Sequence, residues 1–211
     1  MNFERLSKKT NLEKMQGVSE HFDKEKKEFL AKKDKSRKGK IDKKIRKLAD
    51  KINSFDDFYT TSSCSGRILL LAHDKSGRKD KIEWLFSDHN KINFNEIRKT
   101  LDKLPKNDVW FRLQPAILHV ACKNSVLSSK FLNIARDIGF RRSGVISLGK
   151  SKLILELIST EKIETIISKN KKLLIDESYF KILISEGNKK LEKTWKKIDK
   201  LYSELNKLKW L

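Results

Sequence analysis

The chain has 211 residues, of which 37% are hydrophobic, enough for one large domain or two small ones with a core of their own. Lysine and arginine number 49 against 28 aspartate and glutamate residues, and the net charge of +21 is far more than a metabolic enzyme needs to bind one small anion. The composition excludes a collagen-like, mucin-like or disulfide-scaffold protein and favours a polyanion as partner.

The first quarter of the chain is the most basic part and is predicted to be helical. Residues 1–54 carry 18 basic and 9 acidic side chains. Apolar residues recur at helical spacing over 42–53 and, less regularly, over about 18–33, so each stretch predicts an amphipathic helix. The stretch 34–40 between them contains Gly39 and is predicted to be a loop.

Beyond residue 55 the apolar pattern changes to that of short strands. Arg67–His73 and Lys81–Phe86 flank an Asp-Lys-Ser-Gly turn and predict a hairpin. A capping pattern at Asn93 begins a helix that is expected to run to about Leu104.

The second half repeats these elements in the reverse order. Strands are predicted over 109–113 and 116–122, followed by a helix over 125–138 that ends at Gly139, a suitable left-handed cap. A second hairpin is predicted over 144–158.

The order ββαβ followed by βαββ predicts an α/β (α+β) fold, with two helices on one mixed or antiparallel sheet. Uniformly hydrophobic strands such as 67–73 indicate a sheet that is covered on both faces. No Pro- or Gly-rich linker divides the chain, so residues 1–211 are expected to form a single domain. Its parts are a basic helical segment 1–54, a sheet core 55–175 and a long C-terminal helix 177–208. No glycine-rich dinucleotide fingerprint follows a strand, so a doubly wound fold is not expected.

The densest group of polar side chains lies just before a predicted strand, over Thr60–Arg67. Six of these eight side chains carry a hydroxyl or a thiol. Gly66 permits close backbone approach and Arg67 adds a cation, so the segment can present donors to a carboxylate or a phosphate. A polar loop that caps its own backbone is the alternative.

Three further features are candidates for function. Asp34 stands among cations. It is a candidate general base or a candidate anchor that orients Lys or Arg toward phosphate, and a solvated loop is the alternative. His119 and Cys122 lie three residues apart on a predicted strand, hence on opposite faces, so no shared metal is expected. His119 is then either a core residue or points into a cleft beside Thr60–Arg67. The basic loop 139–144 is a candidate phosphate contact or a plain turn.

Several aromatic side chains are candidates for stacking on an exposed RNA base. They are Trp84, Trp110, Phe111 and Phe140. Each such contact would contribute about 1–3 kcal/mol, and core packing is the alternative for each ring.

Nothing in the chain predicts export or a membrane anchor. The first residues contain no apolar leader, and the longest apolar run, Ile68 to Ala72, is far shorter than a membrane span. The two cysteines, Cys64 and Cys122, are expected to be free thiols. A soluble, cytoplasmic protein is therefore predicted.

Four motifs occur in a recognisable order and spacing. They are Asp34-x-Ser36-x-Lys38-Gly39, Ser62-Ser63-Cys64-x-Gly66-Arg67-Ile68, Pro115-x-x-Leu118-His119-Val120-x-Cys122 and Gly139-Phe140-Arg141-x-Ser143-Gly144. With these motifs, the chain resembles the tRNA wybutosine-synthesizing protein 3 family from about Phe22 to Tyr202. One departure is Gln114, which stands where that family carries glutamate.

The resemblance implies a single-domain methyltransferase that uses S-adenosylmethionine and acts on the anticodon loop of tRNA-Phe. It would methylate N4 of the 4-demethylwyosine-type tricyclic base next to the anticodon, in wyosine or wybutosine synthesis. Asp34 would be the catalytic base or orient it. The residues implied for cofactor binding are Ser62, Ser63, Cys64, Gly66, Arg67 and His119. Those implied for substrate binding are Ser36, Lys38, Gly39, Arg141 and Ser143. The basic N-terminal segment and the C-terminal helix would grip the tRNA backbone, and neither a metal nor a membrane is expected.

Two other functions stay open on sequence alone. A non-catalytic RNA-binding module would explain the charge and the aromatic residues, but not the polar cluster over Thr60–Arg67. An RNA-cleaving enzyme would use His119 as acid or base.

Overall fold

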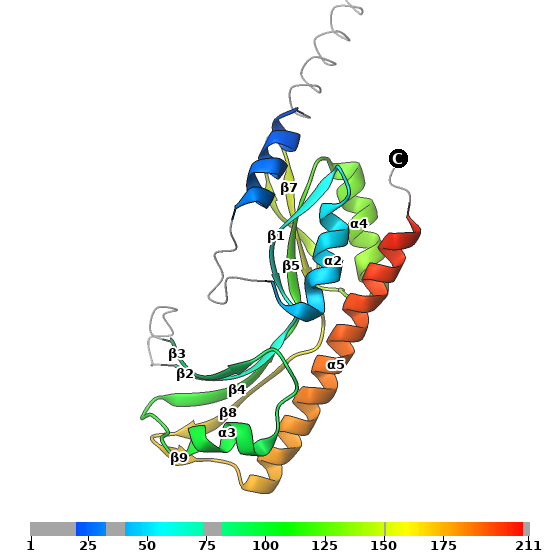
Figure 1. Ribbon diagram of the computed structural model, residues 1–211. Coiled ribbons are helices and arrows are strands. Elements are labelled where there is room, and N and C mark those ends of the chain that lie inside the picture. Colours follow the sequence, from blue (N-terminus) through cyan, green and yellow to red (C-terminus); the bar gives the residue numbers. More distant parts are fainter. Residues whose placement is uncertain (1–19, 33–40, 74–81, 150, 209–211) are drawn as a thin grey trace, which may run out of the picture.

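The computed structural model describes residues 20–32, 41–73, 82–149 and 151–208 (Figure 1). Four residues singled out above, Asp34, Ser36, Lys38 and Gly39, lie outside the described residues, so their roles stay predictions.

The helices lie close to their predicted places. A first helix covers residues 20–31. The others are α2 (Lys43–Asn53), α3 (Phe94–Leu101), α4 (Ser125–Ile138) and α5 (Glu177–Lys207). Helix α3 begins with the capping box that the sequence predicts, since Asn93 and Glu96 each accept the other's backbone N–H, but it ends three residues early. Gly139 ends α4 with a φ of 117°, the left-handed conformation expected there.

The strands include three that sequence analysis missed. They are β1 (Phe58–Cys64), β2 (Arg67–His73), β3 (Ile82–Asp88), β4 (Asp108–Gln114), β5 (Ile117–Cys122), β6 (Gly144–Leu148), β7 (Leu153–Ile158), β8 (Ile163–Lys169) and β9 (Lys172–Leu173). Strand β1 contains most of the polar segment that was expected to be a loop. Its second half carries polar side chains on both faces, so it lacks the apolar alternation of a half-buried strand. Strands β8 and β9 lie between the predicted second hairpin and the C-terminal helix, where sequence analysis predicted no strand.

The strands form two antiparallel sheets in the described part of the chain, where sequence analysis expected one. The first has the order β1-β5-β7-β6 and the second the order β3-β2-β4-β8-β9. The chain passes between the sheets from β1 to β2, from β4 to β5 and from β7 to β8, and the two sheets splay apart at these crossings (Figure 1). The α+β class, the antiparallel pairing and the long C-terminal helix are confirmed.

Helix α5 runs along both sheets and joins their cores. With α2 and α4 it covers the first sheet on the face of Leu118 and Leu155, and with α3 it covers the second on the face of Ile68 and Phe111 (Figure 1). Gly187 lets α5 approach closely, since a Cβ there would lie 3.2 Å from Ile68 and 3.3 Å from Phe111. The opposite faces of both sheets therefore point away from α5 into the angle between the sheets.

The helix over residues 20–31 covers only part of this open side. Phe22 is fully buried against Tyr59 and Ala121 of the first sheet, with ring centroids of Phe22 and Tyr59 5.4 Å apart. Lys152 pairs with Glu25 and so ties β7 to this helix. Toward the second sheet, the same face of the first sheet carries polar side chains.

Candidate functional site

The candidate site lies where the chain crosses between the two sheets. Gly66 makes one crossing with a φ of +88°, a conformation that favours glycine. A Cβ at Gly66 would lie 3.2 Å from both the carbonyl oxygen of Gln114 and the side chain of Leu191. Glycine is thus needed at this position because the crossing from β1 to β2 packs closely against the crossing from β4 to β5 and against α5.

Three polar side chains form a hydrogen-bonded row across three neighbouring strands of the first sheet. Ser62 pairs with His119 in the strand register, and His119 pairs with Glu156. Ser62 Oγ lies 2.9 Å from His119 Nδ1, and His119 Nε2 lies 3.0 Å from Glu156 Oε2. All three are partly exposed on the face away from α5.

The chemistry of the row follows from its acceptor. An ionised carboxylate only accepts hydrogen bonds, so Nε2 of His119 carries a proton and donates to Glu156. In neutral imidazole Nδ1 is then the acceptor, and Ser62 donates its hydroxyl proton to it. The serine oxygen keeps free lone pairs on the open side, so the row can take up a proton there and hold it on an imidazolium beside Glu156.

Arg67 begins β2 on the open face of the second sheet. Its Nε donates to Gln114 Oε1 at 2.7 Å, and its guanidinium lies 4.5 Å from the ring centroid of Trp84. Among the described residues no carboxylate pairs with Arg67. Because Gln114 is neutral, it orients the guanidinium without cancelling its charge, which leaves Arg67 able to bind an anion.

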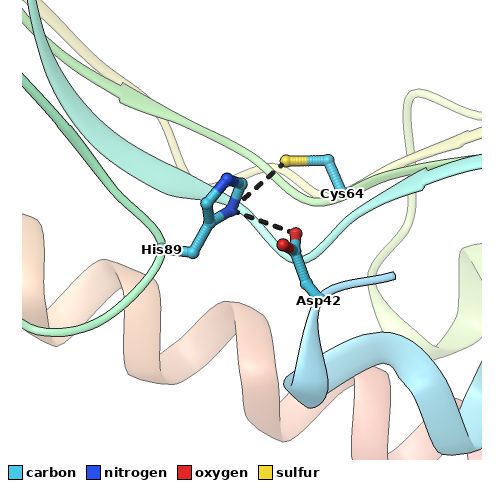
Figure 2. A group of neighbouring side chains, drawn as sticks. All are labelled: Asp42, Cys64 and His89. Atoms are coloured by element: carbon cyan, nitrogen blue, oxygen red, sulfur yellow. Dashed lines mark hydrogen bonds and ion pairs between the residues drawn. The ribbon is translucent and has the colours of Figure 1, made fainter. Parts of the chain in front are cut away.

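A second cluster, formed by Asp42, Cys64 and His89, lies at the crossing from β1 to β2 (Figure 2). His89 Nδ1 lies 3.0 Å from Asp42 Oδ2, 3.0 Å from the carbonyl oxygen of Gly66 and 3.8 Å from Cys64 Sγ. Asp42 also accepts from the backbone N–H and the hydroxyl of Ser65, at 3.1 and 3.3 Å. The start of α2, the end of β1 and the loop after β3 are thus fastened to one carboxylate.

The charges of this cluster are those of an ion pair. Hydrogen bonds from His89 to Asp42 and Cys64 outweigh burial and raise the pKa of His89 from 6.5 to about 9. Burial raises the pKa of Asp42, but the hydrogen bonds from His89 and Ser65 outweigh it and leave that pKa below its ordinary value. Asp42, Cys64 and His89 offer ligand atoms within 4.8 Å of one another. The proton on Nδ1, which faces a carboxylate and a carbonyl, would have to leave before that nitrogen could bind a metal ion.

The other predicted site residues divide into those that lie near the Ser62–His119–Glu156 row and those that lie away from its open face. Gly144 pairs with Glu156 in the register, so the loop with exposed Arg141 leads to the end of the Ser62–His119–Glu156 row. Ser143 is buried, donates to the carbonyl of Phe140 and accepts from the N–H of Ile158. The register places Ser63 opposite Leu118, on the face away from Ser62. Ser63 and Ser143 therefore lie apart from the row's open face.

Sequence reasoning missed Glu156, Asp42 and His89. Glu156 had a signal, since it is the one charged residue in an otherwise apolar strand, Leu153–Ile158. Asp42 read only as the start of a helix, and His89 lies in a short connection without a motif. The stacking candidates Phe111 and Phe140 are fully buried, so those two rings are core residues, whereas Trp84 is 39% exposed.

The described helices contain none that is long and apolar enough to cross a membrane.

The fold and the site define an α+β enzyme outside the doubly wound class, with its polar site between two antiparallel sheets. The family model Methyltransferase TYW3 matches residues 24–207, and the chain belongs to that family of methyltransferases. The resemblance drawn from the four motifs is confirmed.

Relatives and solved structures agree with this membership. A protein of Pyrococcus furiosus called tRNA(Phe) 7-((3-amino-3-carboxypropyl)-4-demethylwyosine(37)-N(4))-methyltransferase 1 is 33% identical over 90% of this chain and 97% of its own length. The tRNA wybutosine-synthesizing protein 3 homolog of Bos taurus is 32% identical over 88% of this chain and 72% of its own. The PH1069 protein of Pyrococcus horikoshii has the same fold, with a TM-score of 0.82 and 32% identity over 90% of this chain and 98% of that one.

Proposed function

We propose that this protein methylates N4 of a 4-demethylwyosine-type base in tRNA-Phe, next to the anticodon, with S-adenosylmethionine as methyl donor. The observation that carries the proposal is the Ser62–His119–Glu156 row, at the crossing where two of the family's motifs meet. The names of the relatives and the net charge of +21 support the substrate.

The reaction needs a group that accepts the proton of the ring nitrogen. S-adenosylmethionine, when bound, would supply the methyl group to N4 with loss of its carbon–sulfur bond, and the oxygen of Ser62 takes up the proton that N4 loses. The hydroxyl proton of Ser62 passes to Nδ1 of His119, and Glu156 stabilises the imidazolium that results. The proton later leaves to solvent, since all three side chains are partly exposed.

The residues at the crossing suit the methyl donor chemically. S-adenosylmethionine, when bound, would supply an electrophilic methyl group on a sulfonium, and its amino-acid end carries a carboxylate. Arg67 has a charge that no described carboxylate neutralises, and it lies only five residues beyond Ser62 in the same segment. We assign the carboxylate to Arg67, with Cys64 and Gly66 in the wall of the same pocket.

Asp34 stays a candidate base or orienting group in this proposal. It lies outside the described residues, and its segment rejoins the described chain at Ile41, beside Asp42 of the crossing. Lys38 and Ser36 belong to the same short segment and stay candidates for substrate contact, as does Arg141 at the other end of the row.

Mass spectrometry of nucleosides tests the proposal directly. tRNA-Phe that carries the tricyclic base without its N4 methyl group is incubated with the protein and S-adenosylmethionine. We expect a gain of one methyl group on that base. A protein that binds the tRNA without adding a methyl group would contradict the proposal and favour a binding module. Cleaved tRNA in a reaction without methyl donor would instead favour a nuclease.

A further inference from the structure

The open face of the second sheet has an unusual outer layer. Trp84, Leu71 and Trp110 lie side by side on β3, β2 and β4, and the next rows along the same face carry Arg112 and Arg67. The described helices that contact this sheet, α3 and α5, lie on its other face (Figure 1). We call these two tryptophans and two arginines the stacking face.

The outer layer covers the apolar side chains of β2 beneath it. Leu69 and Leu71 are 0% and 2% exposed, although no described helix lies over them. Arg67 covers Trp84 at 4.5 Å, and Arg112 lies 5.6 Å from the ring centroid of Trp110. Planar aromatic and guanidinium groups therefore form the outside of the sheet, and Trp84 is still 39% exposed. Such planes are surfaces on which nucleobases stack.

The spacing of the two tryptophans distinguishes between ligands. Trp84 and Trp110 flank β2, and two inter-strand distances place them roughly 10 Å apart. One adenine ring is too small to cover both, whereas successive bases of a single strand reach that far.

Charge favours a polyanion over an apolar partner. Arg67 keeps its charge, since no carboxylate pairs with it among the described residues, whereas Glu164 offsets the charge of Arg112 at 2.7 Å.

From these observations we propose that the stacking face binds single-stranded RNA, namely the anticodon-loop nucleotides beside the target base. The inference rests on the proposed function, because that function places the target base at Ser62. Only Ser63 to Gly66 separate Ser62 from Arg67, at most roughly 17 Å of extended chain. A loop whose target base enters the site therefore has its neighbours within reach of Trp84.

Binding of a fluorescent anticodon stem–loop of tRNA-Phe tests the role of Trp84. We expect Trp84→Leu to weaken binding about 5- to 150-fold, the loss of one stacked base, and Trp84→Phe to stay within threefold of the native protein. The slope of affinity against salt should not change, since stacking releases no counterions. The control Tyr179→Leu removes an exposed aromatic ring from α5 and should leave binding unchanged.

Two outcomes of the binding assay would overturn the inference. Unchanged RNA affinity in Trp84→Leu is the first. The second is a loss of S-adenosylmethionine affinity with RNA affinity retained, which would assign the face to the cofactor's adenine.

A second measurement uses the unmodified protein and so does not depend on how the variants fold. A stem–loop with 5-iodouridine in the loop should crosslink to peptides that contain Trp84 or Trp110, as mapped by mass spectrometry. Crosslinks confined to α5 or to the first sheet would contradict the proposal. Both measurements report binding, so they stand apart from the methylation assay, whose failure would leave an RNA-binding face without this reaction.

Discussion

Glu156 fixes which nitrogen of His119 carries the proton, and it lies at the other end of the row from Ser62, to which the proposed function assigns the target base. Its carboxylate accepts the proton of Nε2 and leaves Nδ1 free to accept from Ser62. A glutamine at the same place can turn its amide toward Nε2 and donate, which would move the imidazole proton to Nδ1 and block the relay. Glu156 is therefore a positioning residue.

Glu156→Gln should lower the kcat of tRNA methylation about 10- to 1000-fold, with little change in the KM for tRNA. Single-turnover rates measured from pH 6 to 9 should also show an altered pH profile, which a purely structural defect would not produce. Glu177→Gln, at an exposed position in the first turn of α5, is the matched control and should behave as the native protein. A kcat in Glu156→Gln within twofold of native would exclude the relay.

Gln114 acts through the guanidinium of Arg67. Replacing Gln114 with leucine removes the acceptor for Nε, so Arg67 loses its fixed orientation. We expect Gln114→Leu to weaken S-adenosylmethionine binding about tenfold by calorimetric titration. Gln114→Glu keeps an acceptor for Nε but places a negative charge beside Arg67, so it should weaken binding less than Gln114→Leu does. Equal losses in the two variants would show that orientation of Arg67 is not what Gln114 provides.

At the scale of elements, the ion pair of Asp42 and His89 fastens helix α2 to the crossing and to the loop after β3 (Figure 2). Because the pKa of His89 is raised to about 9 in the folded protein, this stabilisation is full below about pH 6.5 and is lost as the pH rises through 9. The lowered pKa of Asp42 sets the lower pH limit of this stabilisation, because the ion pair is lost once that carboxylate is protonated.

His89→Gln should therefore destabilise the fold by about 1–3 kcal/mol near pH 6 and by clearly less near pH 10. Denaturant unfolding of both proteins across this range measures the difference. His21→Gln, at an exposed position of the first helix, should not change stability at either pH. A destabilisation that grows toward pH 10 would contradict the assigned ion pair.

At the scale of the whole molecule, the Ser62–His119–Glu156 row and the stacking face both lie on the side of the sheets away from α5 (Figure 1). The prediction that the C-terminal helix grips tRNA stays a prediction, and α5 packs on the sheet faces opposite to the row and the stacking face. The first helix, in contrast, packs on the same face of the first sheet as His119, and its exposed Lys24 and Lys27 suit contacts to the RNA backbone.

Affinity for tRNA should fall steeply with salt, and each lost phosphate contact should reduce the log–log slope by about 0.7–0.9. We expect Lys24→Ala with Lys27→Ala to reduce the slope by one to two such steps. Replacing Lys189, Lys193 and Lys196 of α5 with alanine should leave it unchanged. A flatter slope in the α5 variant alone would place the RNA on the opposite side of the molecule.

Local sequence determined most of the helices and strands. The apolar repeat over 42–53, the cap at Asn93 and the glycine that ends α4 each act over a few residues, so their signals are visible in the sequence. The polar segment Thr60–Arg67 and the four motifs likewise pointed to the site and the family, because particular side chains carry them.

The tertiary structure alone decided how these parts meet. Ser62 and His119 are 57 positions apart, and His119 and Glu156 are 37 apart, so only strand register brings them into one row. The split into two sheets depends on which strands pair after Gly66 and Gln114, and no local pattern records that choice. Pairing energies between distant strands fix the geometry of the site, whereas local propensity fixes only the elements that carry it.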